Sequence, residues 1–155
     1  MRVKPLVSRH YRQLVDDAAK DTQALAVPPE GWIRTVRKAL NMSGAQLAAR
    51  IGSTRGLVSQ TEKNETFGKA SVKSLQQMAD AMGCRLVYAI IPKSSTIESL
   101  IADQARKKAR TVVQYAGQQM ALEDQALNPK QMEREIERLQ NRFISEMPSD
   151  LWNDK

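Results

Sequence analysis

The stretch SGAQLAARIGSTRGLVSQTEKNE, residues 43–65, constrains the fold more than any other part of the chain. Two short amphipathic stretches flank Gly52, a residue type that commonly ends helices. Ser43 is a natural N-cap for the first helix, and Thr54 (or Ser53) for the second, because their hydroxyl groups accept hydrogen bonds from first-turn N–H groups. The apolar positions Leu47 and Val58 then face one side. The pattern predicts two short helices packed against each other.

The hairpin belongs to a longer run of short helices that we expect between residues 32 and 83. The helix before it places its apolar residues on one face. The helix after it begins at Ser71 and ends at Gly83. The inward-facing residues predicted outside the hairpin are Trp32, Ile33, Val36, Leu40, Val72, Leu75, Met78, Ala79 and Met82, and inside it Leu47, Ile51, Leu57, Val58 and Thr61.

Three regions follow from the breaks in the pattern. Residues 1–27 are predicted as an N-terminal helix, which the paired prolines of VPPEG must end by about residue 26. Residues 28–92 hold the hairpin. Residues 93–155 are predicted as a helical extension, with one helix from about Ser95 to Leu127, interrupted or not near Gly117, and another that begins at an Asn128 cap followed by Pro129.

The segment CRLVYAIIP, residues 84–92, is rich in β-branched and aromatic residues and is bounded by Gly83 and Pro92. This composition predicts one short strand over Cys84–Ile91. A single strand needs a partner. The partner is either the same segment of a second copy or another part of the same chain. The expected fold class is mainly α, with this one strand.

Charge is concentrated in the middle of the chain. The 155 residues carry a net charge of +7. Between Trp32 and Lys73 there are eight Lys or Arg residues and two Glu residues, a surplus of six. A basic surface favours a polyanionic partner.

The second helix of the hairpin carries side chains that suit DNA. Arg55 can bind guanine with two hydrogen bonds, and Gln60 can bind adenine in the same way. Ser59 and Lys63 are predicted on the same outward side. The alternative is that the two helices only form a compact core, since many folds contain such a pair without binding nucleic acid.

These residues resemble the Xre/Cro-repressor helix-turn-helix family, over about residues 32–86. The resemblance rests on Leu47–Ala48, Gly52, Val58–Ser59, Glu62 and Ala79–Met82–Gly83. It implies a lambda-repressor-like domain that binds DNA. The chain departs from the family pattern at Lys63–Asn64–Glu65, where a glycine usually follows the glutamate.

The resemblance also implies a set of contact residues, and it makes Glu62 a structural residue. Base contacts fall on Thr54, Arg55, Gly56, Ser59 and Gln60. Phosphate contacts fall on Ser43, Gln46, Lys63 and Asn64.

A narrower resemblance covers most of the chain. GWIRTVRKALNMSGAQLAARIG, MGCRLVYAIIP, QARKKAR, QQMALEDQAL and the late LW pair are similar to mobile mystery protein A, a group found in mobile elements beside a partner with a Fic domain. This implies an antitoxin and transcriptional autorepressor that neutralises a co-encoded Fic-type, AMP-transferring toxin. The alternative is a stand-alone Xre-family repressor whose C-terminal helices serve dimerisation or effector sensing.

Inhibitors of Fic enzymes present a helical glutamate that interferes with the ATP γ-phosphate. Glu123 in QQMALEDQ is the candidate here, although the Ser/Thr and Gly/Asn of the inhibitory pattern are absent. The alternative is that Glu123 is a solvated helix charge. Similarly, the run Arg106–Arg110 is either a second phosphate-binding patch or a solvated helix face.

The remaining motifs argue against catalysis. No nucleophile–base pair, glycine-rich phosphate loop or Cys/His cluster is visible, so we expect no enzymatic activity, no metal and no cofactor.

No apolar run approaches the roughly 18 residues that span a membrane, and the N-terminal sequence lacks a signal-peptide core. A single cysteine, Cys84, is expected as a small buried residue rather than a reactive thiol. We therefore expect a cytoplasmic homodimer that binds a palindromic operator in double-stranded DNA.

Overall fold

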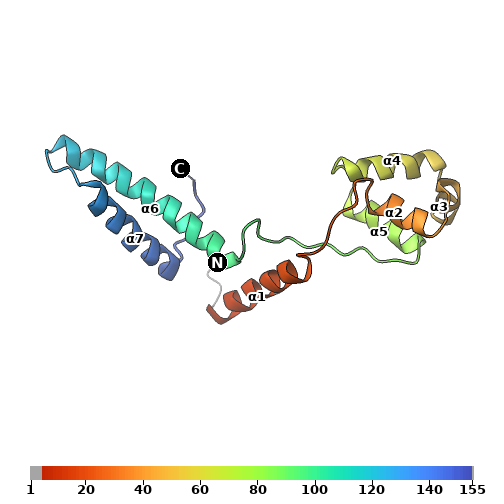
Figure 1. Ribbon diagram of the computed structural model, residues 1–155, viewed down its shortest axis with the longest axis horizontal. Helices are drawn as coiled ribbons and strands as arrows, with labels where there is room; N and C mark the ends of the chain where they lie inside the picture. The colour runs from red at the N-terminus through yellow and green to blue at the C-terminus, as the bar shows by residue number, and fades with distance from the viewer. Residues whose placement is uncertain (1–4, 155) are drawn as a thin grey trace. The chain divides into compact units, whose positions relative to one another are not determined.

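The chain is mainly α-helical and divides into two compact units. The computed structural model describes residues 5–154, and seven helices lie in that range (Figure 1). One unit comprises residues 22–89, and the other comprises residues up to 21 together with residues 90 onward. The helices are α1 Pro5–Asp21, α2 Trp32–Ala39, α3 Gly44–Arg50, α4 Arg55–Thr66, α5 Val72–Ala81, α6 Ile97–Leu122 and α7 Pro129–Glu146.

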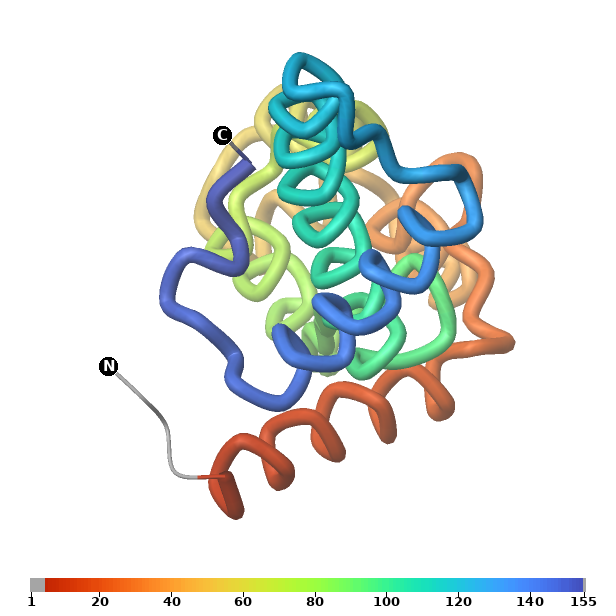
Figure 2. The backbone as a smooth tube through the Cα atoms, turned by 90° about the vertical axis from the view of Figure 1, so that its left-hand side faces the viewer, coloured from red at the N-terminus to blue at the C-terminus, as the bar shows by residue number. Residues whose placement is uncertain are grey.

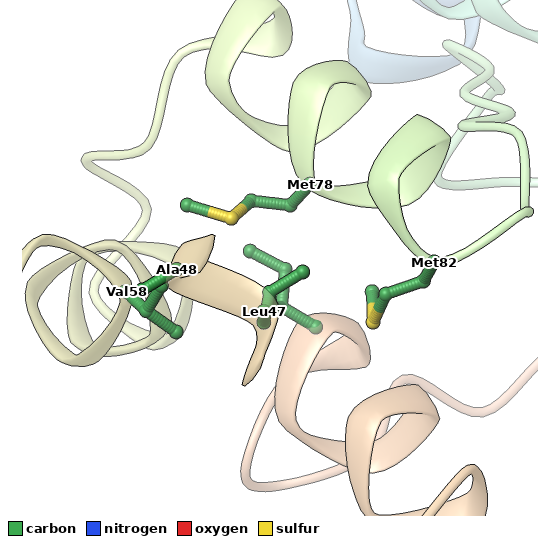
Figure 3. Close-up of a cluster of buried hydrophobic side chains, with 6 residues drawn as sticks. Leu47, Ala48, Val58, Met78 and Met82 are labelled. Carbon is green, nitrogen blue, oxygen red and sulfur yellow. The ribbon is translucent and has the colours of Figure 1, made fainter. Parts of the chain in front are cut away.

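The unit of residues 22–89 encloses a small apolar core among helices α2 to α5. Leu47 of α3 is fully buried, and Val58 of α4 is 1% exposed. Figure 3 shows Met78 of α5 and Met82, the residue just after α5, in one cluster with Leu47, Ala48 and Val58. The buried members of this core are Ile33, Leu47, Ala48, Val58, Met78 and Met82. Burying a side chain of this size stabilises a fold by about 1.5–3 kcal/mol, so this cluster fixes how α3 and α4 meet.

The caps predicted from the sequence are confirmed. The hydroxyl groups of Ser43, Thr54 and Ser71 accept hydrogen bonds from backbone N–H groups at the starts of α3, α4 and α5. Gly52 follows α3 with φ 65°, a left-handed conformation that glycine adopts without steric cost. The turn between α3 and α4 is therefore set by local sequence.

The second unit is built on α6 and α7, which lie side by side (Figure 2). Small residues spaced four apart on α6, including Ala105 and Ala109, are fully buried and let the helices approach closely. Leu151, beyond the end of α7, is also fully buried and packs with Ile101 and Ala105. Helix α6 runs without interruption through Gly117 and ends at Leu122, five residues earlier than the sequence predicted.

Helix α1 belongs to this second unit. It begins at Pro5 and ends at Asp21, shorter than predicted, and none of its residues is buried. The carboxylate of Asp16 accepts a hydrogen bond of 2.9 Å from the backbone N–H of Ile97. The first four residues of the predicted N-terminal helix lie outside the described residues. Asp16 thus caps the start of α6 from a distant part of the sequence.

The predicted strand at Cys84–Ile91 is wrong: these residues form no regular structure. A strand requires backbone hydrogen bonds to a neighbouring segment, and no strand pairing occurs within residues 5–154. The apolar residues that suggested a strand are exposed instead: Val87 is 72%, Tyr88 73% and Ile90 87% exposed. Cys84 is exposed as well, which corrects the expectation that it is buried.

Candidate DNA-binding site

The outward face of α4 carries most of the residues that the sequence predicted as DNA contacts. Arg55, Ser59 and Lys63 are spaced four residues apart and are all exposed, so they form one row along the helix. Gln60 is exposed beside this row. The opposite face of α4 contributes Val58 to the core. The exposed polar row of α4 therefore lies opposite the face that packs into the core.

The first turn of α4 holds Thr54 and Gly56. The hydroxyl oxygen of Thr54 accepts a 3.2 Å hydrogen bond from the N–H of Leu57. A Cβ atom built on Gly56 would have Thr54 Oγ1 as its nearest neighbour, at 3.8 Å, so the fold itself does not require glycine there. Leu57, predicted to face inward, is 49% exposed. The inward prediction for Leu57 is wrong, because the face of α4 that is buried carries Val58, Thr61 and Glu62.

Ser43 and Gln46 form a reciprocal cap at the start of α3. The N–H of Gln46 donates to Ser43 Oγ at 3.1 Å, and the N–H of Ser43 donates to Gln46 Oε1 at 2.7 Å. Both side chains are exposed. A Cβ on Gly44 would lie 3.7 Å from Cγ of Arg55, so the start of α3 and the start of α4 are close neighbours. The predicted phosphate contacts on α3 thus lie near the predicted base contacts on α4.

A buried ion-pair network lies under α4. Glu62 is only 3% exposed, and its carboxylate accepts hydrogen bonds from Nε of Arg37 at 2.7 Å and Nε of Arg34 at 3.0 Å. Arg37 also donates to the carbonyl oxygen of Met42 at 3.0 Å. These contacts tie α4 to α2 and to the turn before α3. Glu62 has the structural position that the family resemblance implied.

The network also shifts the pKa of both partners. Burial alone would raise the pKa of Glu62, but the hydrogen bonds and positive charges of Arg37 and Arg34 outweigh burial and hold that pKa below its ordinary value. The hydrogen bond to Glu62 raises the pKa of Arg37, against the opposing effect of burial. Glu62 is therefore ionised, and it is one of the two acidic residues already subtracted in the surplus of six.

The number of basic residues in the sequence overstates how many cations are free to contact DNA. Lys38 pairs with Glu30 at 2.6 Å, and Nε of Arg50 donates to the carbonyl oxygen of Ala81 at 2.6 Å. Together with the two arginines on Glu62, these residues support the fold. The exposed cations on the outward face of α4 are Arg55 and Lys63.

Glu65 has a structural role that the sequence did not indicate. Its two carboxylate oxygens accept hydrogen bonds from the N–H groups of Trp32 at 2.7 Å and Ile33 at 3.0 Å. Gly31, at the N-cap position of α2, offers no side-chain hydrogen bond, and a Cβ there would lie 2.7 Å from the Glu65 carboxylate. The interaction is non-local: the N–H group of Trp32, which follows Gly31, has its partner 33 residues away.

The departure from the family pattern after Glu62 extends the helix. Residues 63–65 continue α4, which ends at Thr66. The side-chain amide nitrogen of Gln60 donates a 3.0 Å hydrogen bond to Oδ1 of Asn64. Asn64, predicted as a phosphate contact, is half-buried, in contrast to the exposed Lys63. The structure thus brings together one predicted base contact and one predicted phosphate contact.

Three of the four basic residues in the run Arg106–Arg110 on α6 pair within their own unit. Arg106 contacts Glu133, Lys107 pairs with Asp154 at 2.9 Å, and Lys108 pairs with Asp150 at 2.8 Å. A second phosphate-binding patch built on these three residues would first have to break the pairs. Their geometry favours a structural role.

Glu123 lies at the C-cap of α6, immediately after its last helical residue. It is exposed, and its backbone N–H donates to the carbonyl oxygen of Met120. Its side chain therefore stands in the turn before α7, not within a helix.

Comparison with protein families gives the same class of fold as the geometry. Residues 33–88 match the helix-turn-helix family model. The chain therefore carries a helix-turn-helix domain, the class of domain with which many regulators of transcription bind DNA. A search of curated proteins gave no match, and neither did a search of solved structures. Separately, none of the helices within residues 5–154 is both long and apolar enough to cross a membrane.

Proposed function

We propose that this protein is a transcriptional autorepressor of the Xre/Cro type that binds its own operator through α4. The observation that carries the proposal is the exposed row on α4 above the buried contacts of Glu62. A helix that enters the major groove must keep its outward side chains exposed while its orientation is fixed from behind. Both conditions hold for α4. The proposed site of action is the cytoplasm, on double-stranded DNA.

The base contacts are Thr54, Arg55, Gly56, Ser59 and Gln60, and the phosphate contacts are Ser43, Gln46, Lys63 and Asn64. In this assignment the guanidinium group of Arg55 donates two hydrogen bonds to guanine. Gln60 both donates to and accepts from adenine. Gly56, which the fold does not require, lets the backbone approach the duplex.

The protein acts as a homodimer on a palindromic operator. One helix of this length spans only a few base pairs, so a single copy gives little specificity. Two copies place their α4 helices about 34 Å apart, one turn of DNA, and double the number of contacted bases.

A binding assay with paired substitutions tests the DNA assignment. We expect Arg55→Ala with Gln60→Ala to lower affinity for the DNA upstream of the gene by at least tenfold, because each bidentate contact contributes about 1–3 kcal/mol. Arg110→Ala with Gln114→Ala is the matched control, since it removes the same exposed side-chain types from α6. An affinity of the Arg55→Ala and Gln60→Ala variant equal to that of the unmodified protein would remove α4 from the site.

The second part of the proposal is that residues 93–155 bind and neutralise a co-encoded Fic-type toxin. Support comes from the resemblance to mobile mystery protein A and from the separate core of this unit. The α6–α7 pair also leaves large apolar side chains exposed, including Tyr115 at 66% and Leu122 at 82%. Such side chains suit a protein partner better than DNA.

Co-expression with the product of the adjacent gene tests this part. We expect the two proteins to co-purify and the AMP transfer activity of the partner to be suppressed. If Glu123 acts on the nucleotide site, Glu123→Ala releases the activity of the partner while the complex stays intact. Asp124→Ala leaves both the suppression of activity and the complex unchanged. Absence of a complex would contradict the antitoxin role.

The alternative function is a stand-alone repressor whose C-terminal helices serve dimerisation or effector sensing. The pairing of Arg106, Lys107 and Lys108 within the second unit suits a structural role of that kind. Operator binding with no complex in the co-expression experiment would favour this alternative.

A further inference from the structure

Asn64 lies next to the DNA-contacting row of α4 but differs from its neighbours in three ways. It is half-buried, its side chain is already hydrogen-bonded, and its backbone is fixed from the C-terminal side. The carbonyl oxygen of Asn64 accepts hydrogen bonds from the N–H groups of Lys69 at 2.7 Å and Ala70 at 3.1 Å. The next residue, Glu65, is held by its contacts with the start of α2. Asn64 is therefore one of the most firmly anchored residues at this end of α4.

The hydrogen bond between Gln60 and Asn64 leaves the right groups free for adenine. A glutamine amide has two N–H donors and one carbonyl acceptor. One N–H of Gln60 points to Oδ1 of Asn64 at 3.0 Å. The other N–H and Oε1 remain, which are the one donor and one acceptor that a bidentate contact with adenine requires.

The bond also selects the orientation of the Gln60 amide. A free glutamine side chain samples many rotamers, and its amide can present either its oxygen or its nitrogen to a given point. With Oδ1 of Asn64 as the acceptor, the nitrogen side of the Gln60 amide lies toward Asn64 and its oxygen lies away from Asn64. Fixing a contact group before binding lowers the entropy lost when the complex forms.

We propose that Asn64 is a positioning residue, which orients the amide of Gln60 for adenine and so sets base specificity without contacting DNA bases itself. The inference rests on the proposed function, because it requires that α4 enters the major groove. It replaces the phosphate-contact role that the family resemblance implied for Asn64. The two roles differ in a measurable way: a phosphate contact affects all sequences equally, whereas a positioning residue affects one base pair.

The experiment selects preferred sites from a randomised DNA duplex library with the full-length protein and its variants. Gln60→Ala identifies the base pair that Gln60 contacts, as the position whose preference for A·T disappears. Asn64→Ala is expected to reduce the preference at that same position by about fivefold to tenfold and to leave the other positions unchanged. In the Gln60→Ala background, Asn64→Ala is expected to change nothing further, because the two residues act as one unit.

Two further variants separate positioning from charge and folding effects. Asn64→Asp keeps an accepting oxygen, so it is expected to preserve the A·T preference while lowering affinity for every sequence, since it adds a negative charge near DNA. Lys63→Ala is the phosphate-contact control, with uniformly lower affinity and unchanged preference. The helical circular dichroism signal of each variant shows whether that variant is folded. If Asn64→Ala is unfolded, Asn64→Asp tests the proposal in its place.

The outcomes separate the inference from the function on which it rests. If the unmodified protein selects no sequence motif, the proposed function fails. If it selects a motif but Asn64→Ala keeps the full A·T preference, or weakens all sequences as Lys63→Ala does, the positioning role is overturned and the DNA-binding role stands. Loss of the preference in Asn64→Asp would overturn the assigned direction of the hydrogen bond.

Discussion

The two units of the chain use basic residues in opposite ways. In residues 22–89, the partly buried Arg34 and Arg37 pair with the buried Glu62, while Arg55 and Lys63 are left exposed on α4. On α6 of the other unit, Arg106, Lys107 and Lys108 each pair with an acidic residue of the C-terminal part. Exposed cations on a rigid helix can release counterions from DNA, whereas paired cations must first break their pairs.

The comparison shows that the position of basic residues in the fold, and not their number in the sequence, indicates which of them can contact DNA. Both regions look basic in the sequence, and RKKAR in α6 is the denser run. In the helix-turn-helix unit, the exposed cations Arg55 and Lys63 lie next to groups that can hydrogen-bond bases, such as Ser59 and Gln60. The second unit uses its charges to hold its C-terminal residues against α6.

The largest expected effect is the loss of the core contact of α3. Leu47→Ala should lower the free energy of unfolding of residues 22–89 by about 3 kcal/mol, because it removes a fully buried side chain and leaves a cavity. Leu151→Ala should cost the second unit a similar amount. Leu122→Ala, at an 82% exposed site, should have almost no effect. Urea unfolding followed by circular dichroism measures all three, and a large loss in Leu122→Ala would contradict the assignment of the cores.

The next effect separates the buried ion pairs from the surface ones. Glu62→Gln should lower stability by about 2 kcal/mol, since it leaves Arg37, 15% exposed, without its charge partner. Glu133→Gln, which affects the more exposed pair with Arg106, should cost less than about 1 kcal/mol. The same unfolding assay measures both. Equal losses would mean that the Glu62 network is no more important than a surface pair.

The lowered pKa of Glu62 predicts a pH dependence. A carboxylate whose pKa is lower in the folded than in the unfolded state stabilises the fold above its unfolded pKa, and this stabilisation is lost as the pH falls through the folded value. The loss should therefore begin as the pH drops below about 4.5, the ordinary value for glutamate. Unfolding free energies of the unmodified protein and Glu62→Gln, measured between pH 7 and pH 3, should converge on acidification. A constant difference would contradict the network.

A smaller effect distinguishes the cations of the two units on DNA. Lys63→Ala should reduce the slope of log affinity against log salt concentration by about one, as expected for one lost phosphate contact. Lys107→Ala should leave the slope unchanged, because Lys107 lies in the α6–α7 unit and pairs there with Asp154. Fluorescence anisotropy titrations with upstream DNA at several salt concentrations measure both slopes. A reduced slope for Lys107→Ala, with an unchanged slope for Lys63→Ala, would mean that α6 and not α4 contacts the phosphates.

The sequence predicted the local features of the DNA-binding unit well. Caps at Ser43, Thr54 and Ser71 depend on side chains within three residues of the N–H groups they accept from, so a short pattern contains the whole interaction. The outward row of α4 follows from helical periodicity alone. The match of residues 33–88 to the helix-turn-helix family agrees with that pattern.

The features that the sequence did not predict correctly depend on distant partners. Glu65 caps α2 from 33 residues away, and a strand at Cys84–Ile91 would have needed a pairing segment, which none of residues 5–154 provides. A count of charges also does not show that Arg34 contacts the distant Glu62. Leu57 is exposed, although the sequence predicted it to face inward.

An NMR titration of the full-length protein with duplex DNA from upstream of its gene tests most directly whether α4 contacts DNA. Backbone amide signals of residues 53–64 and of the start of α3 should shift, and signals of α6 and α7 should stay in place apart from general line broadening. The Arg55→Ala and Gln60→Ala double variant should lose the shifts in α4. Shifts confined to α6 and α7, with residues 53–64 unaffected, would contradict the assignment of α4 as the recognition helix.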